Sequence, residues 1–313
     1  MTNQKTNLTI IGAGIWGTTL ASLASHNAHS VTLWSRSNPE SLESVIRGAN
    51  VILSAVSMQG VSPIIEQLQQ LKISPSTIIV TATKGLDPVT THTPSQLWYH
   101  AFPENPIVVL SGPNLSKEIK NGLPAATVVS SINEKAAETV QAIFASGTFR
   151  VYINNDPLGT ELGGTLKNVM AIASGVCDGL QLGKNAKAAL LTRALPEMIR
   201  IGTKLGAAAE TFFGLSGLGD LLATCDSPLS RNYQVGYGLA QGKTLDQILA
   251  ELEGTAEGIN TTNVLINLAN KQEIPVPISY QVYRLLTGKI TPDQAVQALM
   301  ERELKSEFYD LDL

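Results

Sequence analysis

Residues 8–20 read L-T-I-I-G-A-G-I-W-G-T-T-L. The first four residues predict a buried strand, which runs directly into Gly12, Gly14 and Gly17 and then into a helical stretch. Glycines at these positions permit a tight turn, so that a pyrophosphate can lie on exposed backbone N–H groups at the positive end of the helix dipole. G-x-G-x-x-G is weak alone but informative where it joins a strand to a helix. We therefore predict a dinucleotide site at this turn.

The first half of the chain alternates short β-branched runs with helical stretches, which predicts a doubly wound parallel sheet. Most of these runs are continuously apolar, as is typical of strands covered on both faces. Crossover helices are expected at residues 61–71 and 134–145. The expected strands are residues 8–11, 30–34, 51–56, 77–82, 106–111 and 125–130, with 149–153 as a candidate last strand.

The second half of the chain predicts only helices, separated by Gly and Pro. Asp156 and Pro157 form a favourable helix start, because Asp accepts hydrogen bonds from the first N–H groups and Pro is tolerated in the first turn. With 313 residues the chain is long enough for two domains. We expect a Rossmann-like dinucleotide-binding domain over residues 1–155, followed by an all-α substrate-binding and catalytic domain over residues 156–313.

The composition is that of an ordinary soluble globular protein, with 43% hydrophobic and 15% charged residues and a net charge of -4. This balance gives no overall field that would attract nucleic acid or anionic lipid, so any phosphate site has to be local. No apolar run is long enough to span a membrane, and the polar N-terminus does not resemble a secretory signal. We expect a cytoplasmic protein that binds neither nucleic acid nor membrane.

The cysteines and histidines give no sign of a disulfide framework or a metal site. Cys177 and Cys225 form no C-x-x-C pair, which suits a reducing compartment, and we interpret both as small core residues. The four histidines have no Cys or acidic partner at the spacing of metal ligands. We expect no metal.

The end of the second expected strand bears on the choice of dinucleotide. Residues 33–37 read L-W-S-R-S, where an NAD-specific site normally places Asp or Glu for the ribose 2′-hydroxyl. No acid is present. Arg36 can pair bidentately with a 2′-phosphate, which favours NADP, although an exposed loop Arg is often only solvated and NAD stays open.

Further polar and glycine-rich segments predict a substrate site. Lys84 follows the fourth expected strand, and S-G-P-N at residues 111–114 follows the fifth, at the sheet edge where ligands of open α/β folds bind. Residues 162–169, L-G-G-T-L-K-N-V, lie in an expected helix, where each interior Gly costs roughly 1 kcal/mol relative to Ala. These glycines either leave room for a ligand beside Lys167 or allow close helix packing. A last cluster, at residues 218–232, combines an acid, a hydroxyl and an Arg suited to phosphate.

Seven motifs in this order strongly resemble the bacterial type of NAD(P)-dependent glycerol-3-phosphate dehydrogenase. They are G-A-G-I-W-G-T, A-T-K-G, S-G-P-N, G-G-T-L-K-N-V, G-L-G-D-L-L-A-T-C, S-R-N and A-E-G, and the similarity spans nearly the whole chain. The resemblance implies hydride transfer between NAD(P)H and C2 of dihydroxyacetone phosphate, giving sn-glycerol 3-phosphate for glycerophospholipid synthesis. It also implies a homodimer.

The same resemblance implies the roles of individual residues. Lys167 exchanges a proton with the substrate oxygen, Lys84 stabilises the charge that develops there, and Asp220 orients Lys167. The implied substrate-binding residues are Lys84, Gly112, Asn114, Lys167, Asp220, Thr224, Ser230, Arg231 and Asn232. The implied cofactor-binding residues are Gly12, Gly14, Ile15, Trp16, Gly17, Arg36, Lys84, Ser116, Arg231 and Glu257.

The sequence departs from the family pattern in one segment, and two other classes of protein remain as alternatives. The family usually has a considerably longer segment where this chain has only residues 37–50, and this bears on cofactor preference. A related dehydrogenase of another hydroxy acid or sugar acid would share the glycine motif, but Lys84 and Arg231 argue against it. In a non-catalytic dinucleotide-binding or redox-sensing protein, a Lys and an Asp on glycine-rich elements would have no purpose.

Overall fold

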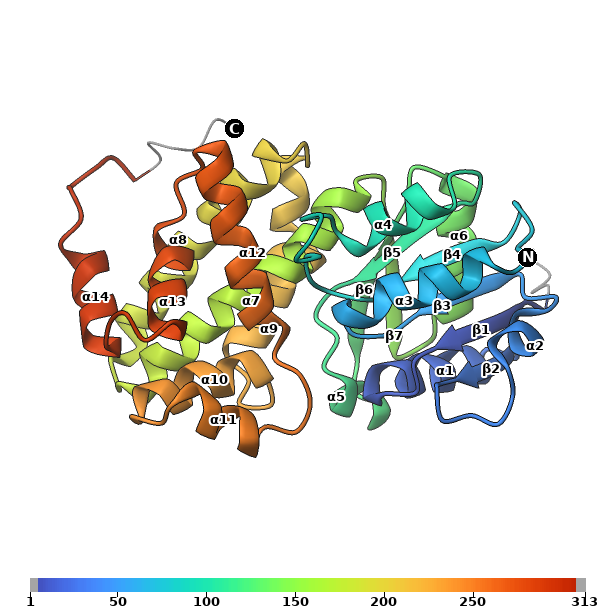
Figure 1. Cartoon of the computed structure of the whole chain (residues 1–313), viewed down its shortest axis with the longest axis horizontal. Helices are drawn as coiled ribbons and strands as arrows, with labels where there is room; N and C mark the ends of the chain where they lie inside the picture. The colour runs from blue at the N-terminus through green and yellow to red at the C-terminus, as the bar shows by residue number, and fades with distance from the viewer. Residues whose placement is uncertain (1–4, 308–313) are drawn as a thin grey trace. The chain divides into compact units, whose positions relative to one another are not determined.

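The computed structural model describes residues 5–307 and divides the chain into two compact units (Figure 1). The N-terminal unit comprises the chain up to Lys84 together with residues 92–161. The helical unit comprises residues 85–91 and the chain from Leu162 onward. The polypeptide therefore passes between the units more than once, and a short loop after the fourth strand is part of the helical unit.

A seven-stranded sheet in the order β2-β1-β3-β4-β5-β6-β7 forms the centre of the N-terminal unit. Strands β1 to β5 are parallel, which confirms the expected Rossmann-like, doubly wound fold. Every expected strand is present, including the candidate last one. The strands are β1 Asn7–Ile11, β2 Ser30–Trp34, β3 Val51–Ser54, β4 Ile78–Thr81, β5 Ile107–Ser111, β6 Ala125–Ser130 and β7 Phe149–Asn154.

Strand β6 corrects the expectation of a wholly parallel sheet, because it pairs with β5 in antiparallel fashion. The connection between them contains only the five-residue helix α5, Ser116–Lys120. Such a helix advances roughly 7 Å, whereas a five-residue strand is roughly 17 Å long, so the chain does not return to the far edge before it re-enters the sheet. Strand β7 then pairs with β6 in parallel.

Helices cover both faces of this sheet, as the continuous apolar strands require. Alternate residues of a strand enter different cores: Leu53 packs with helices α1 (Ile15–His26) and α6 (Glu134–Phe144), whereas Ile52 packs with the helices of the opposite face. Those opposite helices are α2 Leu42–Ile46, α3 Met58–Gln69 and α4 Pro94–Ala101. The two expected crossover helices correspond to α3 and α6.

The helical unit is organised around helix α7, Pro157–Gly179, which begins in the N-terminal unit. Its expected start is confirmed, because the Asp156 Oδ1 accepts a hydrogen bond of 2.9 Å from the Gly159 N–H. Nearly every residue from Leu162 to Val176 is buried, as expected of a helix surrounded by other helices. Cys177 and Cys225 are buried and form no disulfide, which confirms them as core residues.

The other elements of this unit are helical in all residues that the structure describes, as predicted. They are α8 Gly183–Lys204, a 3-10 turn Ala209–Phe213, a π-helical turn Leu215–Gly219, α9 Asp220–Cys225, α10 Arg231–Ala240, α11 Leu245–Glu251, α12 Glu257–Gln272, α13 Pro277–Leu286 and α14 Pro292–Met300.

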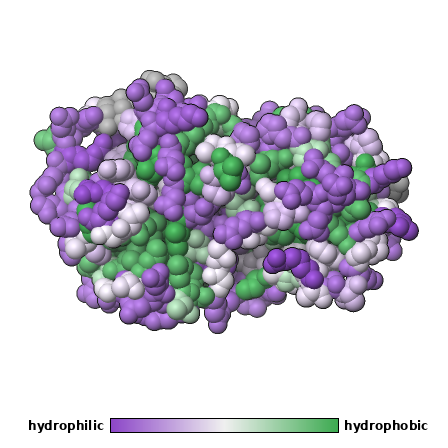
Figure 2. All heavy atoms as spheres, viewed as in Figure 1, coloured by the Kyte–Doolittle hydropathy of each residue, from purple (hydrophilic) through white to green (hydrophobic). Residues whose placement is uncertain are grey.

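The surface is mostly hydrophilic on the face drawn in Figure 2, where hydrophobic residues also show among the helices of the helical unit. Between residues 5 and 307 no helix has the length and apolar character needed to cross a membrane. The same residues contain no group of three or more His, Cys, Asp or Glu side chains that could hold a metal ion.

Candidate active site

The three glycines of the first turn have different surroundings, and each is needed for a different reason. Gly12 has φ +114°, and a Cβ there would lie 2.7 Å from the Ala55 carbonyl oxygen. A Cβ at Gly17 would collide with the Gly12 carbonyl oxygen, so this position allows α1 to approach the sheet. At Gly14, by contrast, a Cβ would meet nothing within 4 Å, so the backbone faces open space.

The N-terminus of α1 is therefore suited to an anion. Gly14 is its N-cap, and the first turn contains no acidic side chain that would compete for its N–H groups. The Ile15 side chain is 62% exposed, whereas Trp16 is half-buried against the core of the N-terminal unit. A dinucleotide pyrophosphate fits this turn, with the backbone rather than side chains as its binding surface.

Lys120 is a residue near this turn that the sequence reasoning missed. It lies at the end of α5, and its Nζ donates a 3.0 Å hydrogen bond to the Thr18 hydroxyl in the first turns of α1. The contact joins residues 102 positions apart. Because no local pattern signals such a contact, only the structure places this positive charge beside α1.

The turn after β2 presents Arg36 to solvent. The turn is fixed by Asn38, whose Oδ1 accepts hydrogen bonds from the Ser35 N–H at 3.1 Å and from the Ser35 hydroxyl at 2.9 Å. In the described part of the chain the exposed Arg36 guanidinium has no hydrogen bond or ion pair. A fixed turn with an uncommitted guanidinium suits a phosphate group on the ribose.

The short segment at residues 37–50 is an ordered part of the N-terminal unit. It contains α2, whose residues Leu42 and Ile46 are buried in the core. The Trp34 indole N–H donates to the Glu40 carbonyl at 2.9 Å, and the Thr9 hydroxyl donates to the Val45 carbonyl at 2.7 Å. The segment is therefore held to β1 and β2, and its shortness leaves the turn at Arg36 intact.

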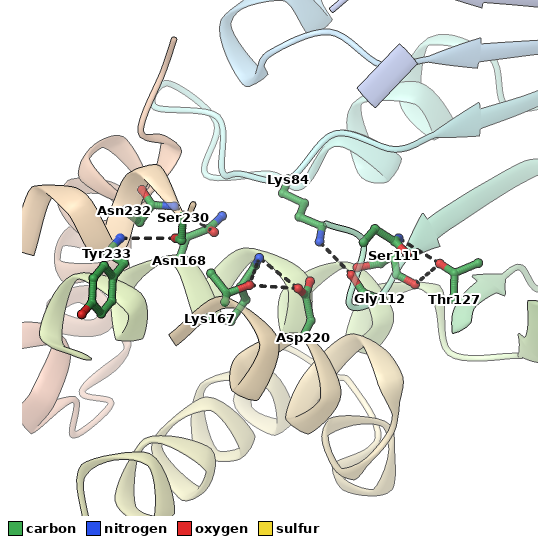
Figure 3. A network of polar contacts seen from close by, with 12 residues as sticks. Lys84, Ser111, Gly112, Thr127, Lys167, Asn168, Asp220, Ser230, Asn232 and Tyr233 are labelled. Carbon is green, nitrogen blue, oxygen red and sulfur yellow. Dashed lines mark hydrogen bonds and ion pairs between the residues drawn. The ribbon is translucent and has the colours of Figure 1, made fainter. Parts of the chain in front are cut away.

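Lys84 and Gly112 come together at the carboxyl ends of β4 and β5, as predicted (Figure 3), and Asn114 follows Gly112 in the same loop. The Lys84 Nζ donates to the Gly112 carbonyl at 3.3 Å. Gly112 has φ +146°, and a Cβ there would lie 3.1 Å from the Thr127 Cα, so a larger residue would be strained. Ser116 follows at the start of α5, and its side chain makes no hydrogen bond to another predicted site residue among residues 5–307.

Thr127 on β6 is a second residue that the sequence reasoning missed. Its hydroxyl donates to the Ser111 carbonyl at 2.9 Å and accepts from the Asn114 Nδ2 at 3.0 Å. The Asn114 Oδ1 is buried without a hydrogen-bond partner in the described chain, although buried acceptors are normally satisfied. Thr127 thus fixes the orientation of Asn114 and leaves its oxygen available. A Thr inside a β-branched strand carries no signal of this role.

In the helical unit, Lys167 of α7 contacts Asp220 and Thr224 of α9. The Lys167 Nζ lies 3.0 Å from the Asp220 Oδ1 and also donates to the Thr224 hydroxyl, which in turn donates to Asp220 at 3.1 Å. The Lys167 and Asp220 side chains are only 9% and 2% exposed. Asp220 and Thr224 are four residues apart, so one face of α9 presents both to the ammonium. We name these residues the Lys167 cluster; it joins three predicted residues.

The π-helical turn Leu215–Gly219 leads directly into α9. Such turns are rare and often occur at functional sites. Here the turn also explains Gly163, because a Cβ at Gly163 would lie 2.8 Å from the Ser216 carbonyl oxygen. Close packing, one of the two explanations considered for these glycines, therefore accounts for Gly163, and room for a ligand is not needed to explain it.

The S-R-N segment starts helix α10 and its three side chains differ in their surroundings. The Ser230 hydroxyl caps the helix by accepting from the Tyr233 N–H at 3.3 Å. Asn232 is buried between helices, where its Nδ2 donates to the Asn168 Oδ1 and its Oδ1 accepts from the Gly258 N–H, both at 2.9 Å (Figure 3). Arg231 is exposed. Of the three, the Arg231 side chain is therefore the most accessible to a phosphate.

Two further residues bear on the predicted cofactor contacts of this unit. Arg231 packs beside Gly254, which has φ +94° and would place a Cβ 2.5 Å from the Arg231 Nη1. Glu257 lies in the first turn of α12 and is half-buried. Gly254 therefore keeps space for the Arg231 guanidinium.

A glycine turn on a Rossmann-like sheet, followed by a helical unit with a buried Lys–Asp pair, defines the class of nicotinamide-dependent oxidoreductases. The sequence model described as "NAD-dependent glycerol-3-phosphate dehydrogenase C-terminus" matches residues 156–297, and its N-terminal counterpart matches residues 7–45 and 37–137. The chain belongs to the NAD-dependent glycerol-3-phosphate dehydrogenase family, which confirms the family expected from the seven motifs.

Individual relatives agree with this assignment. The chain is 65% identical over 308 residues to the glycerol-3-phosphate dehydrogenase (NAD(P)+) of Acaryochloris marina (strain MBIC 11017), covering 98% of this chain and 99% of that protein. It is 64% identical to the enzyme of the same name from Synechocystis sp. (strain ATCC 27184 / PCC 6803 / Kazusa), covering 97% and 96%. The crystal structure of glycerol-3-phosphate dehydrogenase from Coxiella burnetii superposes with a TM-score of 0.90 at 34% identity, covering 95% and 99%.

Proposed function

We propose that this chain reduces dihydroxyacetone phosphate to sn-glycerol 3-phosphate, with Lys167 as the catalytic proton donor. The observation that carries the proposal is the Lys167 cluster, in which a buried ammonium is held by a carboxylate and a hydroxyl in a chain of this family. A bound reduced nicotinamide supplies the hydride that reaches C2 of the ketone. The product alcohol also needs one proton on its oxygen, and the Lys167 ammonium has one to donate.

The surroundings of Lys167 fit this task. A charged amine buried to this extent requires a counter-charge, which Asp220 provides at 3.0 Å. Because Asp220 and the Thr224 hydroxyl contact the ammonium on the side of α9, they fix its position. A positioned donor acts on the oxygen only as negative charge develops there, which is how such groups lower a reaction barrier.

We propose the following substrate-binding residues, each described within its own unit. In the N-terminal unit, Lys84 and the backbone at Gly112 face the sheet edge, and the Asn114 Oδ1 can accept from a substrate hydroxyl. In the helical unit, the exposed Arg231 guanidinium suits a phosphate. Ser230 and Asn232 are already bonded within their own unit, so we propose that they support the segment around Arg231 in addition to any direct contact.

We propose NADP as the preferred dinucleotide, with NAD as the alternative. The turn at Gly12, Gly14 and Gly17, with Ile15 and Trp16, would hold the pyrophosphate, while Arg36 would pair with a 2′-phosphate. The names of the relatives include both cofactors. The Acaryochloris relative aligns over 308 residues, which are 99% of it, so it is about as short as this chain. A short segment after β2 is therefore compatible with this family.

The remaining assignments are proposals from the family resemblance and the composition. Residues 1–155 would bind the dinucleotide, with Ser116 among its contacts, and residues 156–313 would supply the catalytic groups, with Glu257 and Arg231 reaching the cofactor. We further propose a cytoplasmic homodimer that supplies sn-glycerol 3-phosphate for glycerophospholipid synthesis.

The test follows the loss of reduced-nicotinamide absorbance when the purified protein meets dihydroxyacetone phosphate, with NADPH and NADH in parallel. Lys167→Met is expected to lower kcat by a factor of about 1,000 or more, because both the proton donor and its charge are lost. Lys204→Met, at the exposed end of α8, serves as the matched control. A Lys167→Met protein that retains activity close to that of Lys204→Met would contradict the proposal.

A further inference from the structure

A second buried lysine, Lys187, lies in the helical unit outside the Lys167 cluster. It belongs to α8, and its side chain is only 8% exposed. Its Nζ lies 2.7 Å from the Asp178 Oδ2 on α7 and 2.8 Å from the Asp226 Oδ1, which directly follows α9. The Tyr233 ring of α10 lies 5.7 Å from the ammonium, and the Tyr233 hydroxyl donates to Asp178 at 2.8 Å. One ammonium thus joins four helices.

These four helices include the three that carry the proposed catalytic and substrate groups. Helix α7 carries Lys167, α9 carries Asp220 and Thr224, and α10 begins with Arg231. Helix α9 has only six residues, and helices of this length have little stability of their own. Its buried residues Leu221 and Cys225 pack it into the unit, and its position along the neighbouring helices also depends on what holds its two ends.

The two ends of α9 are each held by a buried lysine. At the first residue, Asp220 contacts Lys167, and just beyond the last residue, Asp226 contacts Lys187. The Cys225 carbonyl also accepts a 2.7 Å hydrogen bond from the Ser174 hydroxyl of α7. Asp226 lies roughly 9 Å along the helix axis from Asp220, and the backbone hydrogen bonds of α9 link the two, so a shift at Asp226 also displaces Asp220.

Lys187 is suited to hold a position and not to exchange a proton. Burial by itself lowers the pKa of Lys187, but the hydrogen bonds and charges of Asp178 and Asp226 raise it to about 12. The same contact lowers the pKa of Asp226. Lys187 and Asp226 therefore both stay charged across the neutral range, as a fixed electrostatic contact requires.

We infer that Lys187 is a positioning residue, which sets the place of Asp220 and Thr224 against the Lys167 ammonium by holding the far end of α9. The inference rests on the proposed function, because it takes Lys167 as the proton donor. It assigns a role in the reaction to a residue that belongs neither to the Lys167 cluster nor to the glycine turn.

The experiment measures kcat and KM in the full-length enzyme for Lys187→Met, Lys187→Arg and Asp226→Asn, with thermal unfolding measured in parallel. Lys204→Met is the matched control, since Lys204 is an exposed residue of the last turn of α8. Lys187→Met is expected to lower kcat about 10- to 100-fold and to leave the KM for NADPH within about twofold, as for a misplaced catalytic group. Lys187→Arg is expected to recover most of this loss, and Asp226→Asn to lower kcat in the same direction.

The outcomes separate this inference from the proposed function. If Lys187→Met and Asp226→Asn unfold at lower temperature but keep the wild-type kcat at 25 °C, while Lys167→Met is inactive, then Lys187 only stabilises the fold and the inference is wrong. If Lys167→Met is active, the proposed function is wrong, and the inference about Lys187 is then wrong too, because it takes Lys167 as the proton donor. Should Lys187→Met not fold, Asp226→Asn decides alone, because the Asp226 side chain is 73% exposed and we expect the fold to accept its substitution.

Discussion

Replacing Asp220 by Asn removes the counter-charge of Lys167 and almost nothing else. The two side chains have nearly the same shape, and Asn keeps an oxygen that can accept from the Lys167 ammonium at the position where Asp220 lies 3.0 Å away. Removing one partner of a buried ion pair costs about 3–5 kcal/mol, because a buried charge is left without compensation. The Lys167 and Asp220 side chains are only 9% and 2% exposed, so water screens this pair little. Because Asn keeps an oxygen that can accept from the ammonium, we expect a cost near the lower end of this range.

The expected effects follow from this cost. If the charged Lys167 in its catalytic position is destabilised by about 3 kcal/mol, kcat is expected to fall about 150-fold, since each 1.36 kcal/mol is a factor of ten in rate. In the folded state, the same loss is expected to lower the unfolding midpoint of the helical unit by roughly 5–10 °C. The KM for NADPH should change little, because neither Asp220 nor Lys167 is among the proposed cofactor-binding residues.

The assay measures NADPH oxidation with dihydroxyacetone phosphate over a range of both concentrations, and thermal unfolding by circular dichroism. Asp246→Asn is the matched control, because Asp246 is an exposed acid in the first turn of α11 in the same unit. If a folded Asp220→Asn enzyme keeps kcat within about fivefold of the control, the charge of Asp220 does not set the catalytic state of Lys167. The reasoning from burial would then be refuted.

Two further predictions concern the N-terminal unit. Arg36→Ala is expected to lower kcat/KM for NADPH about 10- to 100-fold, because the 2′-phosphate loses a charged hydrogen-bonding partner, and to leave kcat/KM for NADH within about twofold. Steady-state kinetics with both cofactors will measure the two ratios. Equal losses with both cofactors would exclude a 2′-phosphate contact. Burial outweighs the hydrogen bonds from Ser95 and Thr93 and raises the pKa of Glu161 from 4.5 to about 7. The stability that a raised carboxyl pKa contributes is complete below pH 4.5 and is lost as the pH rises through 7, so the free energy of unfolding should fall by about 3 kcal/mol over this window. Urea unfolding of Glu161→Gln should lack that part of the pH dependence, and an identical dependence in both proteins would contradict the assignment.

The features that could be predicted from the sequence are those imposed by local backbone and hydropathy. Short β-branched runs, most of them continuously apolar, marked the seven strands. The glycines marked the turn, because a Cβ at Gly12 or Gly17 would meet backbone atoms and Gly14 leaves the backbone open. The antiparallel β6 was not predicted, because strand direction depends on how far the short α5 carries the chain. The family motifs likewise gave Lys167, Asp220 and Thr224 together, and the structure joins them.

The contacts that the sequence could not give are those between distant residues of ordinary type. Thr127 contacts Asn114 from a neighbouring strand, and Lys120 contacts Thr18 across 102 positions. Lys187 lies in a plain helical stretch, where an exposed Lys is the normal interpretation. Its partner Asp226 is 39 residues away, and only the packing of α8 beside α9 makes the pair. Burial of a charged side chain is a property of tertiary structure, so its signal appears only after folding.

The two buried lysines also indicate why the helical unit tolerates so much polarity in its interior. Lys167 and Lys187 each require desolvation, and a hydrophobic core of the same shape would often be equally stable or more stable. Asp220 and Asp226 lie at opposite ends of the same six-residue helix, however, so the pairs together define where α9 sits along α7 and α8. Apolar packing alone is less specific, because similar side chains can slide past one another. The ion pairs thus give the short helix a single position, and the placement of a proton donor to within a fraction of an ångström requires that kind of positional definition.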